Sequence, residues 1–245
     1  MVKLSARMLH LADMVPRGAI LADVGTDHGY IPIYLVQSGK ICRAFAMDIR
    51  EGPLLRAKEH IRAFGLDDYI TVRRSDGVAA LHPGEADTIL IAGMGGDVML
   101  HILEAGKAVL AAAKDLVLQP QSKILQVREY LCQEGYVIDR EDMVSEEGKY
   151  YPMMHVALRS SYSARELCAS YGKEERRMFF RYGEHLLKEK NAVLQQYLEG
   201  QIRQYEEILN GLAAKQQTKA LQARREAICE ELACARRAAA FQKED

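Results

Sequence analysis

Two aspartates and two glycines lie close together near the N-terminus: Asp23, Gly25, Asp27 and Gly29. Asp23 lies at the end of a short apolar run, where its carboxylate can hold loop amides or the amino group of a ligand. Gly25 and Gly29 let the backbone approach a ligand where a β-carbon would collide. This pattern predicts a ligand-binding turn between a strand and a helix. The alternative is a glycine turn that only connects the two elements.

The acid between the glycines narrows the class of ligand. The dinucleotide fingerprint is G-x-G-x-x-G, whereas Asp27 lies between the two glycines here. A carboxylate at that point repels a pyrophosphate but suits the cationic sulfonium and ammonium groups of S-adenosyl-L-methionine. We therefore expect that cofactor rather than NAD, and methyl transfer as the chemistry. His28 either contacts cofactor or substrate, or caps the following helix.

Two further acids follow later apolar runs. Asp48 closes the second run, and an acid there accepts hydrogen bonds from ribose hydroxyls in nucleotide-binding folds. A lone aspartate at a strand end is more often a helix cap. Asp76 and Gly77 follow the third run, where they either reach the exocyclic amine of an adenine or cap the turn at 78–81.

The fourth run leads into a glycine-rich stretch that contains Ala92, Gly93, Met94 and Gly95. Methyltransferases that act on exocyclic amines of nucleobases often carry Asn/Asp-Pro-Pro-aromatic here, and that motif is absent. Its absence argues against methylation of adenine N6 or of a glutamine amide, whereas a ring nitrogen has its lone pair already available. The stretch either leaves open backbone beside the transferred methyl group or is only a strand-to-helix turn.

The order of the elements predicts how these residues meet. Strand-like runs cover 20–24, 41–47, 69–73, 88–92, 115–118, 136–143 and 150–158, and helix-like segments include 51–64, 97–110 and 123–134. This alternation predicts an α/β fold with a parallel sheet. The last two runs have no helix between them and form a hairpin. We expect the seven-stranded, Rossmann-like sheet of class I methyltransferases, with the last strand antiparallel.

The carboxyl edge of such a sheet binds the ligand. Gln119 follows the fifth run at that edge, where its amide can pair with a base. Tyr150 lies in the final hairpin and reaches the same face only if the loop folds over.

Beyond residue 159 strand signals disappear, and leucine and isoleucine recur at helical spacing. We expect a methyltransferase domain over 1–160 and a helical domain over 161–245. This spacing predicts two long helices, with the chain reversing direction between residues 210 and 218, and we expect them to pair as a coiled-coil hairpin. The alternative is a pair of helices packed flat on the sheet domain. Arginine pairs on these helices either contact phosphates or are solvated.

Composition excludes several classes of protein. The 245 residues carry a net charge of −1, which is unlike a strongly basic nucleic-acid-binding protein. Five cysteines without a CxxC pair predict no zinc site and no disulfide framework. No apolar run is long enough for a membrane span, and the N-terminus lacks a secretory signal. We expect a cytoplasmic protein with no metal and no obligate protein partner.

The motifs together resemble the bacterial tRNA (adenine-22-N1)-methyltransferase family. The matching segments are ADVGTDHGYIP at 22–32, EGP at 51–53, SDG at 75–77, IAGMGG at 91–96, LQPQ at 118–121 and EGKYY at 147–151. The family's N-terminal Leu-Ser-Lys-Arg-Leu stands here as Leu4-Ser5-Ala6-Arg7-Met8, so the lysine is lost and Arg7 remains. Gln121 stands where an asparagine is commoner.

The resemblance implies methyl transfer from S-adenosyl-L-methionine to N1 of an adenosine in the D-arm region of tRNA, with the helical tail binding the tRNA body. It implies cofactor contacts from Asp23, Gly25, Asp27, His28, Gly29, Asp48, Asp76, Gly77, Ala92 and Gly93. It implies substrate contacts from Arg7, Met94, Gly95, Gln119 and Tyr150, and names no catalytic base. Two alternatives stay open: a methyltransferase for a small molecule or protein with a dimerising tail, and a non-catalytic RNA-binding module.

Overall fold

The computed structural model describes residues 1–159, 164–213 and 218–244. The chain divides into two compact units, Met1–Leu167 and Cys168–Asp245. The boundary expected after residue 160 lies outside the described residues.

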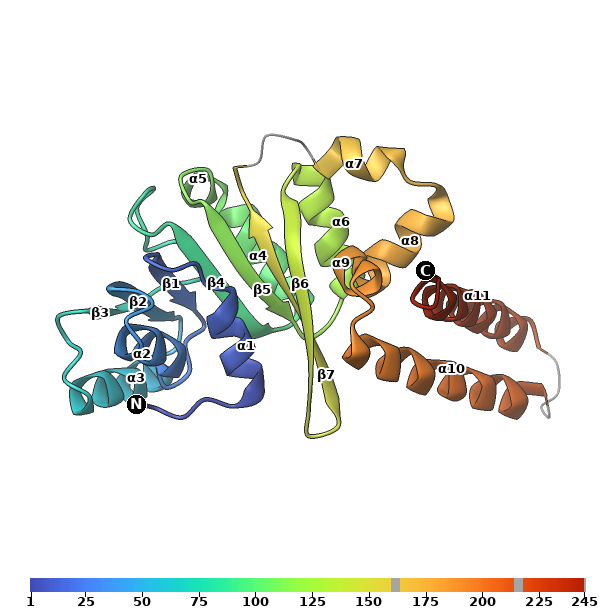
Figure 1. The fold of residues 1–245 in the computed structure, drawn as a ribbon, viewed down its shortest axis with the longest axis horizontal. Coiled ribbons are helices and arrows are strands. Elements are labelled where there is room, and N and C mark those ends of the chain that lie inside the picture. Colours follow the sequence, from blue (N-terminus) through green and yellow to red (C-terminus); the bar gives the residue numbers. More distant parts are fainter. Residues whose placement is uncertain (160–163, 214–217, 245) are drawn as a thin grey trace. The chain divides into compact units, whose positions relative to one another are not determined.

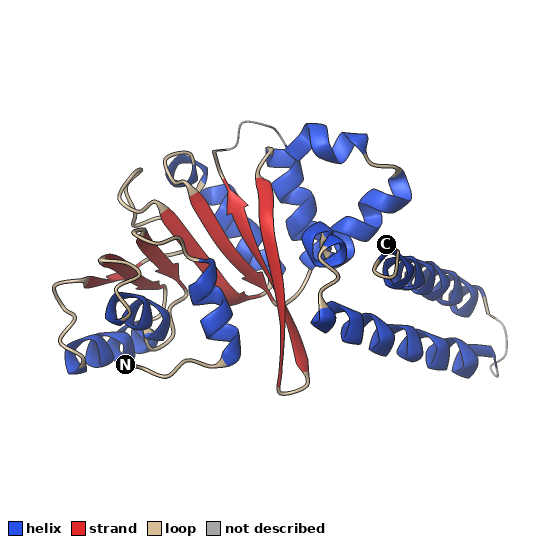
Figure 2. Cartoon of the chain, viewed as in Figure 1, coloured by secondary structure: helices blue, strands red, loops and turns tan. Residues whose placement is uncertain are grey.

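The first unit is built on one seven-stranded sheet (Figures 1 and 2). The strand order is β3-β2-β1-β4-β5-β7-β6. The bounds of the strands are β1 Ile20–Val24, β2 Arg43–Asp48, β3 Ile70–Arg74, β4 Thr88–Met94, β5 Asp115–Pro120, β6 Val137–Glu146 and β7 Lys149–Ala157. Strands β1 to β5 pair in parallel, whereas β7 pairs antiparallel with both β5 and β6. The Rossmann-like methyltransferase sheet predicted from the sequence is confirmed.

This topology collects the ends of several strands at one edge. The parallel strands β1, β2, β4 and β5 all end there. Because β6 is antiparallel to β7, it runs in the same direction as β5 and also ends at that edge. The loops that carry the predicted ligand-binding residues therefore lie side by side.

Helices cover both faces of the sheet, and the side chains of each strand alternate between them. Leu21 and Leu90 pack on one face with α1 (Ala6–Met14), α2 (Tyr30–Gln37) and α3 (Glu51–Ala63). Ala22 and Ile89 pack on the other face with α4 (Gly96–Ala105), α5 (Lys107–Leu110) and α6 (Ile124–Glu134). Figure 1 shows these two helical layers in front of and behind the strands.

Most strand boundaries differ from the prediction by one to three residues, and two departures have a local structural reason. The second strand begins at Arg43 rather than at residue 41, because the Ile41 N–H donates to the Leu35 carbonyl at the end of α2. The helix expected over 97–110 is interrupted at Gly106. A β-carbon there would lie 2.4 Å from Cγ2 of Val78, so the chain passes too close to its neighbour for a larger residue.

The second unit is helical. It contains α8 (Lys173–Tyr182), α9 (Glu184–Lys188), α10 (Ala192–Ala213) and α11 (Lys219–Phe241), and α7 (Ala164–Ser170) spans the boundary between the units. Helices α10 and α11 lie antiparallel along each other (Figure 1). Part of the reversal expected between them, residues 214–217, lies outside the described residues. That the pair is a coiled coil stays a prediction.

Buried side chains from every helix of this bundle form its core, among them Phe179, Leu187, Leu198 and Ala235. Ion pairs join the helices around this core, such as Arg236 with Glu206 at 2.8 Å. None of the helices in the described part of the chain is long and apolar enough to cross a membrane.

Candidate functional site

Two buried carboxylates lie at the carboxyl edge of the sheet. Asp23 is the penultimate residue of β1 and Asp48 the last of β2, and they are 7% and 6% exposed. Burial raises the pKa of Asp23 to about 6, and the nearby charge of Asp48 adds to this effect. Two acids held in this way favour a ligand that brings positive charge or hydroxyl donors.

Asp48 is held in place by the start of the next helix. Its Oδ1 accepts a hydrogen bond from the Arg50 N–H at 2.7 Å, and the Arg50 side chain lies 3.6 Å away. The carboxylate therefore fixes the turn that leads into α3, but the N-cap residue of that helix is Arg50 and not Asp48. Within the described residues the Asp48 Oδ2 atom makes no hydrogen bond or ion pair, so the same carboxylate can also accept bonds from a ligand.

The glycine loop after β1 turns sharply against β2. The N–H groups of Gly25 and Thr26 both donate to the Met47 carbonyl, each at 2.8 Å. Gly25 has φ +77°, and the Met94 side chain lies directly over it. The Thr26 hydroxyl is buried beside Asp23, and its interaction with that carboxylate offsets part of the rise in the Asp23 pKa that burial causes. The loop thus combines a close backbone approach with a buried hydroxyl next to a buried carboxylate.

Asp27 and His28 lie farther out than the sequence suggested. Asp27 is 63% exposed and pairs with the Arg56 guanidinium on α3 at 3.1 Å. The His28 ring lies next to the rings of Tyr30 and His60, with centroids 5.2 and 5.3 Å away. Helix α2 begins after Gly29, which has φ +69° and no side-chain cap, so His28 is not the cap.

Asp76 and Gly77 form a turn after β3 at the same edge. Asp76 is exposed, and Gly77 has φ +53° with its backbone close to Ile102. Ser75 rather than Asp76 stabilises the turn, since its hydroxyl donates to the Gly77 carbonyl and accepts from the Ala80 N–H. The Asp76 carboxylate is left facing solvent beside the edge.

The loop after β4 is joined to the N-terminal helix through one glutamine. The ladder between β4 and β5 shifts register between Ala92 and Met94, and Gly93 adopts φ +74° at that bulge. The Gln119 Oε1 accepts from the Gly93 N–H at 3.2 Å and from Nη1 of Arg7 at 3.1 Å. Gln119 is 0% exposed, so its amide holds other groups of the site rather than facing solvent.

Arg7 contacts two side chains, from Tyr151 and Glu146, that the sequence analysis did not identify as its partners. Its guanidinium stacks 5.0 Å from the centre of the Tyr151 ring and lies 3.9 Å from Glu146. These partners are far away in the sequence, and only the pairing of α1 with the final hairpin brings them together. The predicted residue Tyr150 precedes Tyr151 in β7, is half-buried and lies opposite Ser145 of β6.

The glycine after Met94 is part of a helix start. Gly95 is the residue before α4, and the Gly96 N–H donates to the Ser122 hydroxyl at 3.1 Å. A β-carbon at Gly96 would lie 2.5 Å from the Ser122 carbonyl oxygen. The glycine-rich stretch therefore serves close packing of the two loops as well as an open backbone at Gly93.

Comparison with known proteins adds to this geometry. A family model described as a methyltransferase domain matches residues 4–154. The tRNA (adenine(22)-N(1))-methyltransferase of Bacillus subtilis (strain 168) is 41% identical over 192 residues, which are 78% of each chain.

Solved structures are similar over nearly the whole chain. The B. subtilis M1A22 tRNA methyltransferase TrmK has a TM-score of 0.85 and 32% identity, covering 98% of this chain and 100% of its own. Streptococcus pneumoniae Sp1610 in complex with S-adenosyl-L-methionine has a TM-score of 0.82 and 30% identity, covering 97% and 100%.

Proposed function

Because this chain belongs to the tRNA (adenine(22)-N(1))-methyltransferase family, we propose that the carboxyl edge of its sheet is the site where cofactor and adenosine meet. The enzyme uses S-adenosyl-L-methionine to methylate N1 of adenosine 22 in tRNA. We further propose a role for each residue of this site. The observation that carries it is the pair of buried carboxylates, Asp23 and Asp48, beside the glycine loop.

The residues at this edge fit the cofactor. We assign Asp48 to the ribose hydroxyls, since its carboxylate is fixed at the end of β2. We assign Asp23 and the neighbouring Thr26 hydroxyl to the cationic methionine end, where an ionised carboxylate favours positive charge. Asp76 and Gly77 border the adenine. When bound, the cofactor supplies a methyl group on a positively charged sulfur.

Asp27 and His28 have a more distant role than the sequence predicted. Arg56 already balances the charge of Asp27, and the His28 ring is packed against Tyr30. We assign them to the outer wall of the loop, where they add negative potential and rigidity rather than a direct bond to the ribose.

The substrate side of the site is built around Arg7. Gln119 holds the Arg7 guanidinium beside Gly93, and the guanidinium lies over the Tyr151 ring. We assign Arg7 to contacts with the target nucleotide, and Met94 to the apolar wall over the glycine loop. The N1 lone pair needs orientation rather than deprotonation, so the main task of these residues is to hold the base in line at short distance. The target adenosine leaves its pairing to reach them.

The helical unit is proposed to bind the body of the tRNA. Arg224 and Arg225 are exposed on α11 and can contact phosphates. Arg177 and Arg181 are less suitable, because both pair with Glu231 inside the bundle. Since tRNA is the substrate, we also propose that the enzyme works in the cytoplasm.

Two substitutions separate the two sides of the site. Asp48→Ala is expected to weaken cofactor binding by roughly 10-fold or more, as loss of hydrogen bonds to a charged group does. Arg7→Ala is expected to leave cofactor affinity within about twofold and to lower methylation of a tRNA transcript. Calorimetry and a methyl-incorporation assay measure the two effects. Unchanged cofactor affinity in Asp48→Ala, or an equal loss of cofactor affinity in Arg7→Ala, contradicts the assignment.

A further inference from the structure

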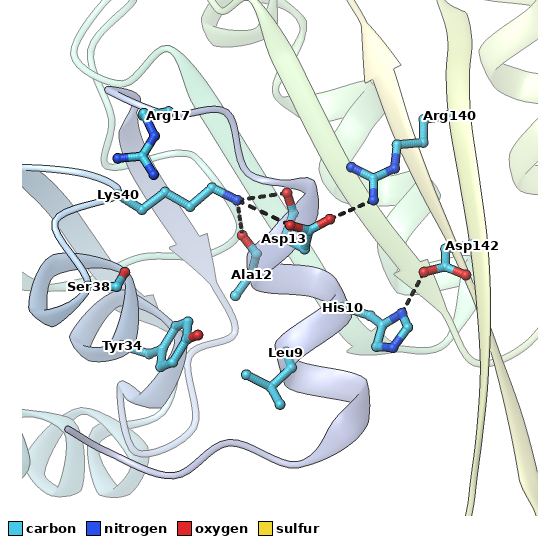
Figure 3. Close-up of a pocket in the computed structure, with 10 residues that line it drawn as sticks. All are labelled: Leu9, His10, Ala12, Asp13, Arg17, Tyr34, Ser38, Lys40, Arg140 and Asp142. Carbon is cyan, nitrogen blue, oxygen red and sulfur yellow. Dashed lines mark hydrogen bonds and ion pairs between the residues drawn. The ribbon is translucent and has the colours of Figure 1, made fainter.

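The opposite end of helix α1 borders a second pocket, of about 570 Å³. It is lined by residues from α1 and the turn after it, from α2 and the turn after it, and from β6 (Figure 3): Leu9, His10, Ala12, Asp13, Arg17, Tyr34, Ser38, Lys40, Arg140 and Asp142. None of the residues assigned to cofactor or adenosine lines this pocket.

Helix α1 connects the pocket to the methylation site through a row of polar pairs with β6. Residues three apart on one face of the helix meet residues 146, 142 and 140 of the strand. The pairs are Arg7 with Glu146 at 3.9 Å, His10 with Asp142 at 2.5 Å and Asp13 with Arg140 at 2.6 Å. Arg7 lies at the carboxyl edge, and Asp13 lies at the pocket. At about 1.5 Å of rise per residue, the two are roughly 10 Å apart along the helix.

Both acids that line the pocket, Asp13 and Asp142, already have side-chain partners. The hydrogen bond from Arg140 lowers the pKa of Asp13, so its carboxylate is ionised and paired. The Lys40 ammonium lies 3.9 Å from the same carboxylate and donates to the carbonyls of Ala12 and Asp13, where it caps α1 (Figure 3). The Asp142 carboxylate is hydrogen-bonded to the His10 ring.

The cationic side chains that line the pocket, Arg17, Lys40 and Arg140, outnumber its carboxylates, Asp13 and Asp142, by one. Arg17 is exposed, lines the pocket and forms no ion pair with any residue in the described ranges. The Arg140 side chain is 48% exposed, so part of its guanidinium faces the pocket as well. The Tyr34 side chain adds a hydroxyl to the lining. Cations in surplus over paired acids, with further donors around them, suit an anion that accepts several hydrogen bonds.

We propose that this pocket binds a backbone phosphodiester of the tRNA, with Arg17 as the main contact and Arg140 as the second. The proposal rests on tRNA being the substrate. An RNA strand that leaves the methylation site along α1 passes the pocket within a few nucleotides of the target adenosine. Contact there fixes the register of the RNA without reading its sequence, as phosphate contacts do.

The test measures binding of an unmodified tRNA transcript by fluorescence anisotropy over a range of KCl concentrations. Arg17→Gln removes the unpaired charge and leaves the pairs of Asp13 and Asp142 in place. Arg62→Gln is the matched control, because Arg62 is another exposed arginine, on α3, that does not line the pocket. Calorimetry with S-adenosyl-L-methionine reports on the methylation site independently.

We expect Arg17→Gln to weaken tRNA binding roughly 3- to 10-fold and to reduce the slope of log K against log salt by about 0.7 to 0.9, the loss of one phosphate contact. Its KM for tRNA rises while kcat and cofactor affinity stay unchanged. The tRNA affinity of Arg62→Gln stays near that of the wild type, and Arg17→Glu loses more tRNA affinity than Arg17→Gln.

Two results overturn the proposal. One is an Arg17→Gln protein with wild-type affinity and salt slope. The other is an Arg62→Gln protein that loses as much tRNA affinity as Arg17→Gln. That result would assign the effect to the overall electrostatic potential of the protein and not to this pocket. A wild-type enzyme that binds tRNA without methylating it contradicts the proposed function instead. The pocket proposal is then decided by the tRNA affinities and salt slopes of the variants.

Discussion

The Met94 methyl carbon lies 2.1 Å from the point that a β-carbon on Gly25 would occupy. The loop after β1, which we assign to the cofactor, is therefore packed directly beneath the loop after β4, which we assign to the boundary with the substrate. Gly25 also has φ +77°, a conformation that side chains disfavour. Two separate requirements thus fix glycine at this position.

Gly25→Ala is expected to lower both stability and cofactor affinity. The substitution strains the backbone by about 1 kcal/mol or more and pushes Met94 away from the loop. Thermal unfolding and calorimetry with S-adenosyl-L-methionine measure the two effects.

Gly39→Ala separates strain from collision. Gly39 has φ +66° but nothing within 4 Å of an added β-carbon, so it shares only the strain. Its stability loss should be smaller, and its cofactor affinity should stay at the wild-type value. Met94→Ala combined with Gly25→Ala should recover part of the loss. Equal effects of the two alanine substitutions on cofactor affinity would show that contact with Met94 is unimportant.

Cofactor affinity is expected to depend on pH through Asp23. Burial raises the pKa of this carboxyl to about 6, so it is protonated below that pH and ionised above it. If the ionised form attracts the cationic cofactor, affinity falls up to tenfold per pH unit below about 6 and is flat above it. Calorimetry between pH 5 and 8 gives the profile. A wild-type profile identical to that of Asp23→Asn argues against this role.

The same carboxyl affects stability with a defined sign. Its pKa is raised from 3.8 to about 6 on folding, so between these values the folded state holds a proton that the unfolded state has released. The contribution of Asp23 to the free energy of unfolding therefore falls as pH rises through this window. Asp23→Asn should remove that contribution. Denaturant unfolding of both proteins at pH 4 and pH 7 tests the difference, and an unchanged pH dependence in the variant contradicts it.

Gln119 is expected to be a positioning residue. Gln119→Leu leaves the Gly93 N–H and one donor of Arg7 without their shared acceptor, at a cost of about 1–3 kcal/mol. Methylation should fall through kcat, while cofactor affinity changes little. Gln126→Leu, at an exposed position of α6, is the matched control. If Gln119→Leu raises only the KM for tRNA, the residue is a direct substrate contact and the positioning role is wrong.

A buried ion pair outside the proposed site is expected to matter for stability alone. Arg128 on α6 and Glu141 on β6 are 2% and 1% exposed and lie 2.8 Å apart. Arg128→Met removes the arginine partner of the buried Glu141 carboxylate, and breaking such a pair costs about 3–5 kcal/mol. Chemical denaturation measures this loss. The double variant with Glu141→Leu should be more stable than Arg128→Met, and a further loss in the double variant would contradict the account.

Much of the fold could be predicted from local sequence patterns. Consecutive apolar residues such as Leu21 and Ala22 mark strands that are covered on both faces, and the missing helix before β7 indicates the antiparallel hairpin. The details that failed depend on neighbours distant in sequence. The interruption at Gly106 follows from contact with Val78, and nothing in the helical pattern itself reveals it.

The candidate site divides in the same way. Asp23, Asp48 and the glycines are recognisable because each stands next to a strand end, and the topology then gathers them. The partners of Arg7 are not recognisable, because Glu146 and Tyr151 come from the last hairpin. Burial is equally hard to predict: the sequence pattern places Gln119 after the fifth strand, yet it lies within β5 and its amide contacts Arg7 and Gly93.

The most direct test of the account is reverse transcription of a tRNA transcript after incubation with the enzyme and S-adenosyl-L-methionine. Methylation at N1 blocks Watson–Crick pairing, so the account predicts a stop at adenosine 22, which is absent with Asp48→Ala and absent from a transcript that carries guanosine at position 22. A stop at another adenosine, or full-length extension from the wild-type reaction, contradicts the central claim.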